Sequence, residues 1–190
     1  MNELSLPAHR WFQSLSRCLL VSALLGLAHT AKGAESSAEF SKGVIDIGIV
    51  VSDAERTAQF LTNAIGFTEV KGFSVTPELG RKIGLVDGHP VEVRVFKLTE
   101  GEQATSIKVL SFPKAGGKKA DQTFIHSTLG MRYLTLYVKD MSRSLERLKA
   151  AKVQTLGETP LDLGGGTYIT VVRDPDDNFI ELIGPMKTSK

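Results

Sequence analysis

Two segments of this chain carry the same residues in the same order, and this repetition limits the possible folds more than any other feature of the sequence. The matched pairs, each 87 positions apart, are Val51 and Val138, Asp53 and Asp140, Arg56 and Arg143, and Leu61 and Leu148. In both segments an alternating apolar stretch precedes the aspartate, which is a favoured residue at helix N-termini, and apolar residues with helical spacing follow it. The pattern indicates an internal duplication of a β-α-β-β-β unit.

The first copy is expected over residues 40–113. A helix begins at Asp53 and ends before Gly66, since a glycine suits the left-handed residue that closes a helix. The stretch 72–90, which Gly and Pro interrupt, is expected to be an irregular insert. Alternation of apolar and polar residues predicts strands at 44–51, 67–70, 91–96 and 106–110.

A linker and a shorter second copy follow. The polar, glycine-rich segment 114–123 is the expected linker, and the second copy covers 124–185 without an insert. Alternation predicts a strand at 133–138, a helix at 140–151 and a further strand that opens at 153–156. The three glycines at 164–166 precede a strand and lack the helix amides that bind phosphate, so they predict a turn.

The first 33 residues have the three-part composition of a secretory signal peptide. Arg10 and Arg17 come first, an apolar run over 18–28 follows, and small residues including Ala31 and Gly33 come last. The apolar run is shorter than the roughly 20 residues that cross a bilayer, which favours a cleaved leader over a stable membrane anchor. We therefore expect an exported protein, either periplasmic or extracellular.

Charge and cysteine content narrow the classes of function. The whole chain carries a formal charge of +2, but the leader takes Arg10, Arg17 and Lys32 from the 23 basic residues and Glu3 from the 21 acidic ones. The remaining protein is formally neutral, so no nucleic-acid partner is expected. The single cysteine, Cys18, lies in the leader, which leaves the mature chain without a disulfide or a thiolate metal site.

The segment 173–185 combines a tight turn with a strand that carries one carboxylate. Pro175 is followed by three residues that favour turns. In the next strand Ile180 and Leu182 point to one face and Glu181 to the other. A carboxylate between apolar neighbours needs a partner or a wetted concave surface, because burying it alone is costly.

These features together resemble the vicinal oxygen chelate superfamily, which contains glyoxalase I, bleomycin-resistance proteins and extradiol dioxygenases. The resemblance rests on the strand-helix-Gly-Phe unit at 45–67, its repeat and the closing motif at 174–182, and it covers about 44–185. Asp177 stands where the family usually has Gly. The resemblance implies an α+β fold in which two βαβββ modules form a curled mixed sheet with one cup-shaped cavity and helices on the outer faces.

The resemblance also implies metal ligands on the first and last strands of each module, and here the chain departs from the family. The matching positions hold Asp46, Lys108, Tyr133 and Glu181, of which only Glu181 is the usual ligand type. A protonated ammonium has no lone pair and a neutral tyrosine is a poor ligand, so two carboxylates remain. No cofactor is therefore expected; if a divalent metal binds, Asp46 and Glu181 are its protein ligands.

Three interpretations of these four positions stay open. In the first, Lys108 replaces the cation and forms a salt bridge with Glu181, Asp46 or both on the floor of the cup. In the second, Lys108 is a catalytic amine or Glu181 is a general base with a perturbed pKa. In the third, Asp46, Glu181 and waters hold a metal.

Other side chains are candidates for the wall of the same cup. Arg94 shares a face with Phe96 opposite Val93, so it could hold an anionic ligand; an exposed place on the strand is the alternative. The hydroxyl-bearing candidates, for which ordinary packing is the alternative, are Tyr137, Tyr168, Thr135 and Thr170.

Two functional classes follow from the resemblance. The first is a metal-free protein that binds a small organic molecule in the cup, as in the bleomycin-resistance branch. The second is a metal-dependent enzyme of the glyoxalase or dioxygenase type with an atypical ligand set. Because these modules pair within and between chains, a homodimer is an alternative to a monomer.

Overall fold

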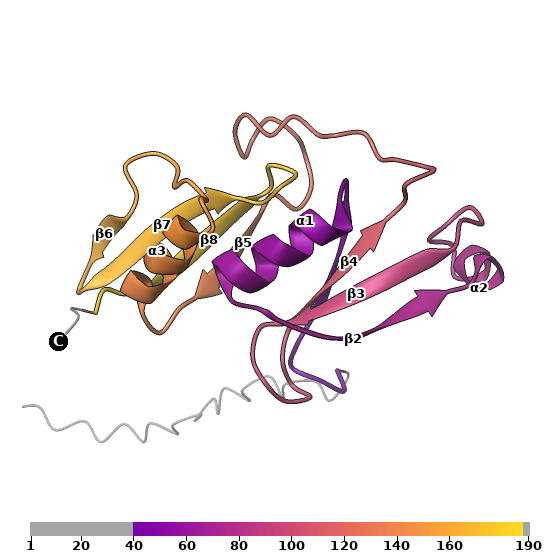
Figure 1. Cartoon of the computed structure of the whole chain (residues 1–190), viewed down its shortest axis with the longest axis horizontal. Coiled ribbons are helices and arrows are strands. Elements are labelled where there is room, and N and C mark those ends of the chain that lie inside the picture. The colour runs from indigo at the N-terminus through magenta and orange to yellow at the C-terminus, as the bar shows by residue number, and fades with distance from the viewer. Residues whose placement is uncertain (1–39, 188–190) are drawn as a thin grey trace, which may run out of the picture. The chain divides into compact units, whose positions relative to one another are not determined.

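A computed structural model describes residues 40–187 of the chain (Figure 1). The expected signal peptide at 1–33 lies outside these residues. Each half of the described chain forms one four-stranded mixed sheet, with strand orders β1-β4-β3-β2 and β5-β8-β7-β6. No helix within 40–187 is long and apolar enough to cross a membrane.

The first half contains β1 to β4 and three helical segments. Its first and last strands pair in parallel, with Asp46 beside Ser106 and Gly48 beside Lys108, whereas β3 pairs antiparallel with both of its neighbours. In chain order the elements are β1 (Asp46–Val51), α1 (Ala54–Gln59), the π-helix η1 (Phe60–Ile65), β2 (Thr68–Val75), α2 (Pro77–Lys82), β3 (Val91–Lys97) and β4 (Ser106–Ser111).

The second half repeats this strand order. Its first and last strands, β5 and β8, again pair in parallel, and Thr135 lies beside Glu181. The elements are β5 (Tyr133–Tyr137), α3 (Met141–Ala150), β6 (Leu161–Gly164), β7 (Thr167–Arg173) and β8 (Phe179–Pro185). The α+β fold with two four-stranded mixed sheets confirms the expected class, and the two sheets stay separate instead of closing into one.

Both helices of the repeated units begin as the sequence predicts. The side chain of Asp53 accepts hydrogen bonds from the amides of Glu55 and Arg56, and that of Asp140 accepts from Ser142 and Arg143. These caps satisfy amides that have no partner inside a helix. After α1 the chain widens into η1, which ends at Gly66 with the expected left-handed backbone (φ 100°).

The expected irregular insert is in large part ordered, which corrects the prediction for 72–90. β2 continues through Gly72 by way of a bulge, and a Cβ at Gly72 would lie 2.1 Å from the carbonyl oxygen of Val93. Glycine therefore permits the strand to continue where it was expected to end. Thr76 and Pro77 then begin α2, with the Thr76 hydroxyl accepting from the Leu79 amide.

A second correction concerns the strand expected at 153–156. Only an isolated bridge forms there, between Thr155 and Val172, and the edge strand is β6. The glycines at 164–166 all have positive φ and connect β6 to β7 in a hairpin turn, as expected. Before β6 begins, the chain turns at Gly157, which has a positive φ of 59°.

One hydrophobic core contains residues of both sheets and of α1, η1 and α3. Its most deeply buried members include Leu61, Ala64, Phe96, Ile107, Met141, Leu148, Val172 and Leu182. A polar contact joins the helices: Arg147 on α3 donates a hydrogen bond of 3.0 Å to the carbonyl of Ile65 at the end of η1. The two halves are therefore stabilised together, because neither buries its helix alone.

Candidate functional site

A charged pair lies on the face of the first sheet that points away from the core. Ile107 and Val109 pack in the core, so Ser106 and Lys108, which alternate with them along β4, point to the opposite face. The ammonium Nζ of Lys108 lies 2.9 Å from Oδ2 of Asp46. The hydroxyl of Ser106 donates a hydrogen bond to the other carboxylate oxygen of Asp46.

The environment of Asp46 favours its charged form. The hydrogen bond from Ser106 is the main reason that the pKa of Asp46 is lowered, and the contact with Lys108 adds to it. The side chains of Lys108 and Asp46 are 34% and 45% exposed to solvent. They therefore form a surface ion pair and not a buried one. Such pairs contribute about 1 kcal/mol or less.

The second sheet presents another carboxylate on its corresponding face. Oε2 of Glu181 accepts a hydrogen bond of 2.7 Å from the hydroxyl of Thr135 on the neighbouring strand. Tyr133 and Tyr137 flank Thr135 on the same face of β5, and the Tyr137 side chain is 80% exposed. We call the two faces that point away from the core the open faces.

The four positions that match the family ligands thus divide between the two sheets of residues 40–187, and only Asp46 and Lys108 contact each other. Lys108 forms the salt bridge with Asp46 that the first interpretation expects. Within the described residues, it forms none with Glu181. Tyr133 is half-exposed beside Phe179. In the described part of the chain, no group of three or more His, Cys, Asp or Glu side chains is placed to hold a metal.

The insert covers part of the open face of the first sheet. Val93 and Val95 of β3 lie beside Leu110 and Lys108 of β4 and therefore share their face. They are buried in a second apolar cluster together with Val86, which belongs to the insert. The pair of Lys108 and Asp46 thus borders an apolar surface to which the insert contributes. The glycine and proline content of the insert does not predict this contribution.

Arg94 lies on the other face of the sheet, which differs from its expected place in the cup. Its guanidinium makes ion pairs of 2.8 Å with Glu55 on α1 and 2.7 Å with Glu69 on β2. The hydrogen bond from Arg94 lowers the pKa of both carboxyls, and the hydrogen bonds to Glu69 and Glu55 raise the pKa of the guanidinium. This geometry ties α1 to the sheet and leaves Arg94 engaged by protein groups.

Tyr168 and Thr170 also lie on the core side. Tyr168 packs against the core cluster, and the fully buried Thr170 donates to the sulfur of Met141. Tyr137 and Thr135 are on the open face, so the four hydroxyl-bearing candidates divide between the two faces of the second sheet. Candidates that remain together on that open face are Tyr133, Thr135, Tyr137 and Glu181.

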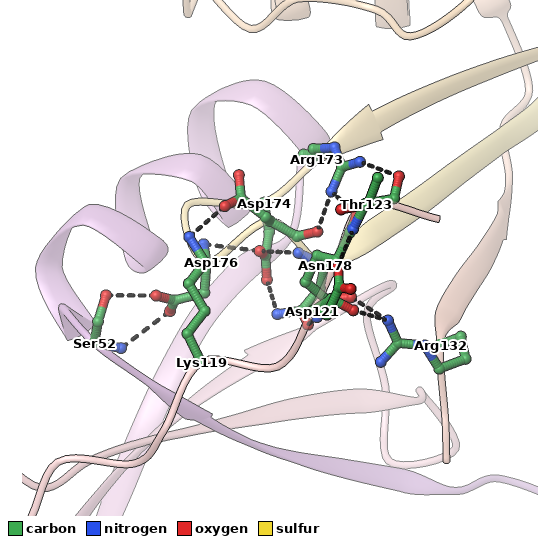
Figure 2. Close-up of polar contacts among 11 residues, drawn as sticks. Ser52, Lys119, Asp121, Thr123, Arg132, Arg173, Asp174, Asp176 and Asn178 are labelled. Carbon is green, nitrogen blue, oxygen red and sulfur yellow. Dashed lines mark hydrogen bonds and ion pairs between the residues drawn. The ribbon is translucent and has the colours of Figure 1, made fainter. Parts of the chain in front are cut away.

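The turn between β7 and β8 joins distant parts of the chain (Figure 2). Asp177 has a left-handed backbone (φ 67°), which explains why a glycine is usual there. Asp176 accepts a hydrogen bond of 3.0 Å from the amide of Ser52. Asn178 accepts one of 2.8 Å from Gln122 in the linker, and Arg173 donates to the carbonyls of Gln122 and Thr123. The prediction of a tight turn did not reveal these contacts.

The fold is shared with solved structures. A glyoxalase family protein from Bacillus cereus has a TM-score of 0.63 and 19% identity, with 79% of this chain and 99% of that chain covered. A glyoxylase/bleomycin resistance protein/dioxygenase domain from Frankia sp. EAN1pec has a TM-score of 0.53 and 20% identity, with 78% and 95% covered. No curated protein sequence matches this chain.

The sequence itself also matches a family model over most of its length. The model of the Glyoxalase/Bleomycin resistance protein/Dioxygenase superfamily matches residues 43–182, which include all eight strands up to the centre of β8. The chain therefore belongs to the Glyoxalase/Bleomycin resistance protein/Dioxygenase superfamily.

Proposed function

We propose that this chain is an exported member of the superfamily that binds a small organic molecule on its open faces without a resident metal. The carrying observation is the ion pair between Lys108 and Asp46, with Nζ 2.9 Å from Oδ2. The ammonium already supplies the positive charge that a carboxylate at this position requires, and it would repel a divalent ion. Asp46 is therefore not free to act as a ligand.

The second open face suggests the chemistry of the molecule that binds. Glu181 is a carboxylate that accepts one hydrogen bond from Thr135, and carboxylates have room for several. The exposed rings of Tyr133 and Tyr137 lie on the same face. A carboxylate that shares a face with two exposed aromatic rings favours a ligand with an apolar body and a cationic or hydrogen-bond-donating group.

The metal-dependent alternative is tested with wild-type protein and Lys108→Glu. We expect wild-type protein to purify without stoichiometric zinc, iron or manganese and to show no increase in Tm when these ions are added. Lys108→Glu replaces the ammonium with a carboxylate beside Asp46, so a divalent ion should raise its Tm by several degrees. Metal analysis and thermal unfolding measure both results.

Lys139→Glu is the matched control, since it makes the same charge change at an exposed position outside the site. Its Tm should not respond to metal. Stoichiometric metal in the wild-type protein would overturn the metal-free proposal and support a glyoxalase- or dioxygenase-type enzyme, with Asp46 and Glu181 as the first ligands to substitute. A metal response of the control equal to that of Lys108→Glu would also contradict the proposed role of this pair.

Export is the second part of the proposal. The basic, apolar and small residues of 1–33 support cleavage near Ala34. Mass spectrometry of the protein recovered from outside the cytoplasm should show the loss of residues 1–33. Recovery of the chain with Met1 intact in a soluble cytoplasmic fraction would contradict export.

We also propose a homodimer in which open faces of two chains cover the ligand. Val50 on the first open face and Tyr137 on the second are exposed apolar or aromatic side chains, and a second chain laid on these faces would remove them from water. Sedimentation equilibrium of the wild-type protein would show a single monomeric species if this part of the proposal is wrong.

A further inference from the structure

A groove of about 580 Å³ is lined by residues of β1 and β5, the strands at the edges of the two sheets. Its wall on β1 consists of Ile45, Ile47 and Ile49, which alternate with the residues of the open face. Leu61 from the helical segment and Ile180 from β8 complete the apolar part. Val50, Tyr133 and Phe179, which lie on the open faces, also line the groove, so it adjoins those faces at their edges. Its isoleucine wall, however, lies on the side of β1 opposite to Asp46.

The groove has an unusual polar atom in its wall. Thr57 lines it and is 1% exposed, and its hydroxyl has no hydrogen-bond partner within the described residues. Thr62, further along the same helical segment, shows the ordinary arrangement, with its hydroxyl donating to the carbonyl of Ala58 at 2.9 Å. A buried hydroxyl without a partner is unfavourable, so a partner supplied by a bound molecule would remove this cost.

The charged residues at the groove do not call for a charged ligand. Arg132 donates to the carbonyls of Ile125 and Asp121 and to the side chain of Gln122. Asp174 accepts from the amides of Asp176 and Asn178 and from the Asn178 side chain. Both charged groups are thus engaged by the protein, and they carry opposite charges.

We propose that this groove is a second binding site, which takes a neutral, mainly aliphatic molecule with one hydroxyl or carbonyl group. The apolar body lies against the isoleucines of β1, and the polar group forms a hydrogen bond with the Thr57 hydroxyl. The volume falls in the range of small-molecule sites, which are mostly apolar with few, well-placed polar groups. Ile45 is 68% exposed, so the ligand also covers apolar surface that is otherwise in water.

The experiment is titration calorimetry of the full chain with 1-decanol below its solubility limit. Wild-type protein should bind one decanol saturably. Thr57→Val keeps the shape of the side chain and removes the hydroxyl, so decanol should bind about five- to tenfold more weakly. The unliganded Thr57→Val protein should unfold at the same or a higher urea concentration, because no protein hydrogen bond is lost. Thr62→Val is the matched control and should bind decanol as the wild type does.

A second pair of variants tests the groove by filling it. Ile45→Trp places a large side chain in the groove from an exposed position and should abolish decanol binding without unfolding the protein. Leu85→Trp makes a similar change at an exposed apolar residue of the insert and should leave binding unchanged. Absence of saturable binding to wild type, or equal binding to Ile45→Trp, would overturn the proposal. So would a wild-type dimer that Ile45→Trp converts to monomer, because a second copy would then occupy the groove.

Discussion

Asp174→Ala is expected to lower the free energy of unfolding by about 3–4 kcal/mol, as measured by urea unfolding at pH 7. The Asp174 carboxylate is buried and accepts three hydrogen bonds within the turn, from the amides of Asp176 and Asn178 at 2.9 and 2.8 Å and from the Asn178 side chain at 2.8 Å. Hydrogen bonds to a charged acceptor contribute about 1.5–3 kcal/mol each, and their removal leaves the amides unpaired. Because the contributions are not additive, we expect less than their sum.

The loss of stability should extend beyond the turn, because residues of the turn also form hydrogen bonds with distant segments of the chain. Figure 2 shows its neighbours Ser52 and Thr123, which come from the segment after β1 and from the linker. Asp162→Ala is the matched control: Asp162 is exposed and accepts one amide hydrogen bond, from Gly164. Its loss should be below about 1 kcal/mol. Equal losses for the two variants would show that the turn does not stabilise the fold as described.

Asp174→Asn separates the charge of this group from its hydrogen bonds. Burial raises the pKa of Asp174, although the hydrogen bonds from Asn178 and Asp176 act in the opposite direction. A raised pKa means that the folded chain holds the proton more tightly, so the contribution to stability is present below the unfolded pKa and is lost as pH rises through the folded value. The deficit of Asp174→Asn relative to wild type should therefore be larger near pH 3 than at pH 7.

Alternation in the sequence predicted which side chains share a face, but not which face the core covers. Arg94 and Phe96 were correctly grouped against Val93, yet both faces of β3 are buried, one by α1 and one by the insert. A period of two carries no information about which neighbour covers which face. For the same reason Tyr168 was grouped with Tyr137 although the two lie on opposite faces.

The sequence predicts the helix ends correctly, because each end depends on residues close together in the chain. Asp53, Asp140 and Gly66 cap their helices as expected, because capping depends on one side chain and a few neighbouring amides. Gly72 was interpreted as the end of a strand, because the feature that requires glycine there is the carbonyl of Val93 from another strand. The contact between Lys108 and Asp46 was foreseen only through the resemblance to a family, since it joins residues far apart in sequence.

Gly184→Ala should be among the most damaging single-methyl changes in the second sheet, with a loss of about 3 kcal/mol in the free energy of unfolding. A Cβ at Gly184 would lie 2.1 Å from the carbonyl oxygen and 2.7 Å from Cγ2 of Val138. The amide of Val138 is itself bonded to Ile183 at 2.8 Å, so this segment cannot move away without breaking the contact between β5 and β8. Any shift of β8 would also displace Glu181 and weaken ligand binding on the open face.

Gly48→Ala is the matched change in the first sheet, and urea unfolding of both variants provides the comparison. Gly48 lies beside Lys108 on the open face, and a Cβ there would meet only Cδ1 of Leu110 at 3.9 Å, an ordinary contact. Alanine also reduces the freedom of the unfolded chain, so Gly48→Ala should leave stability unchanged or raise it by up to about 1 kcal/mol. If both glycines tolerated alanine equally, β8 would have room beside Val138, and the close packing that positions Glu181 could not be correct.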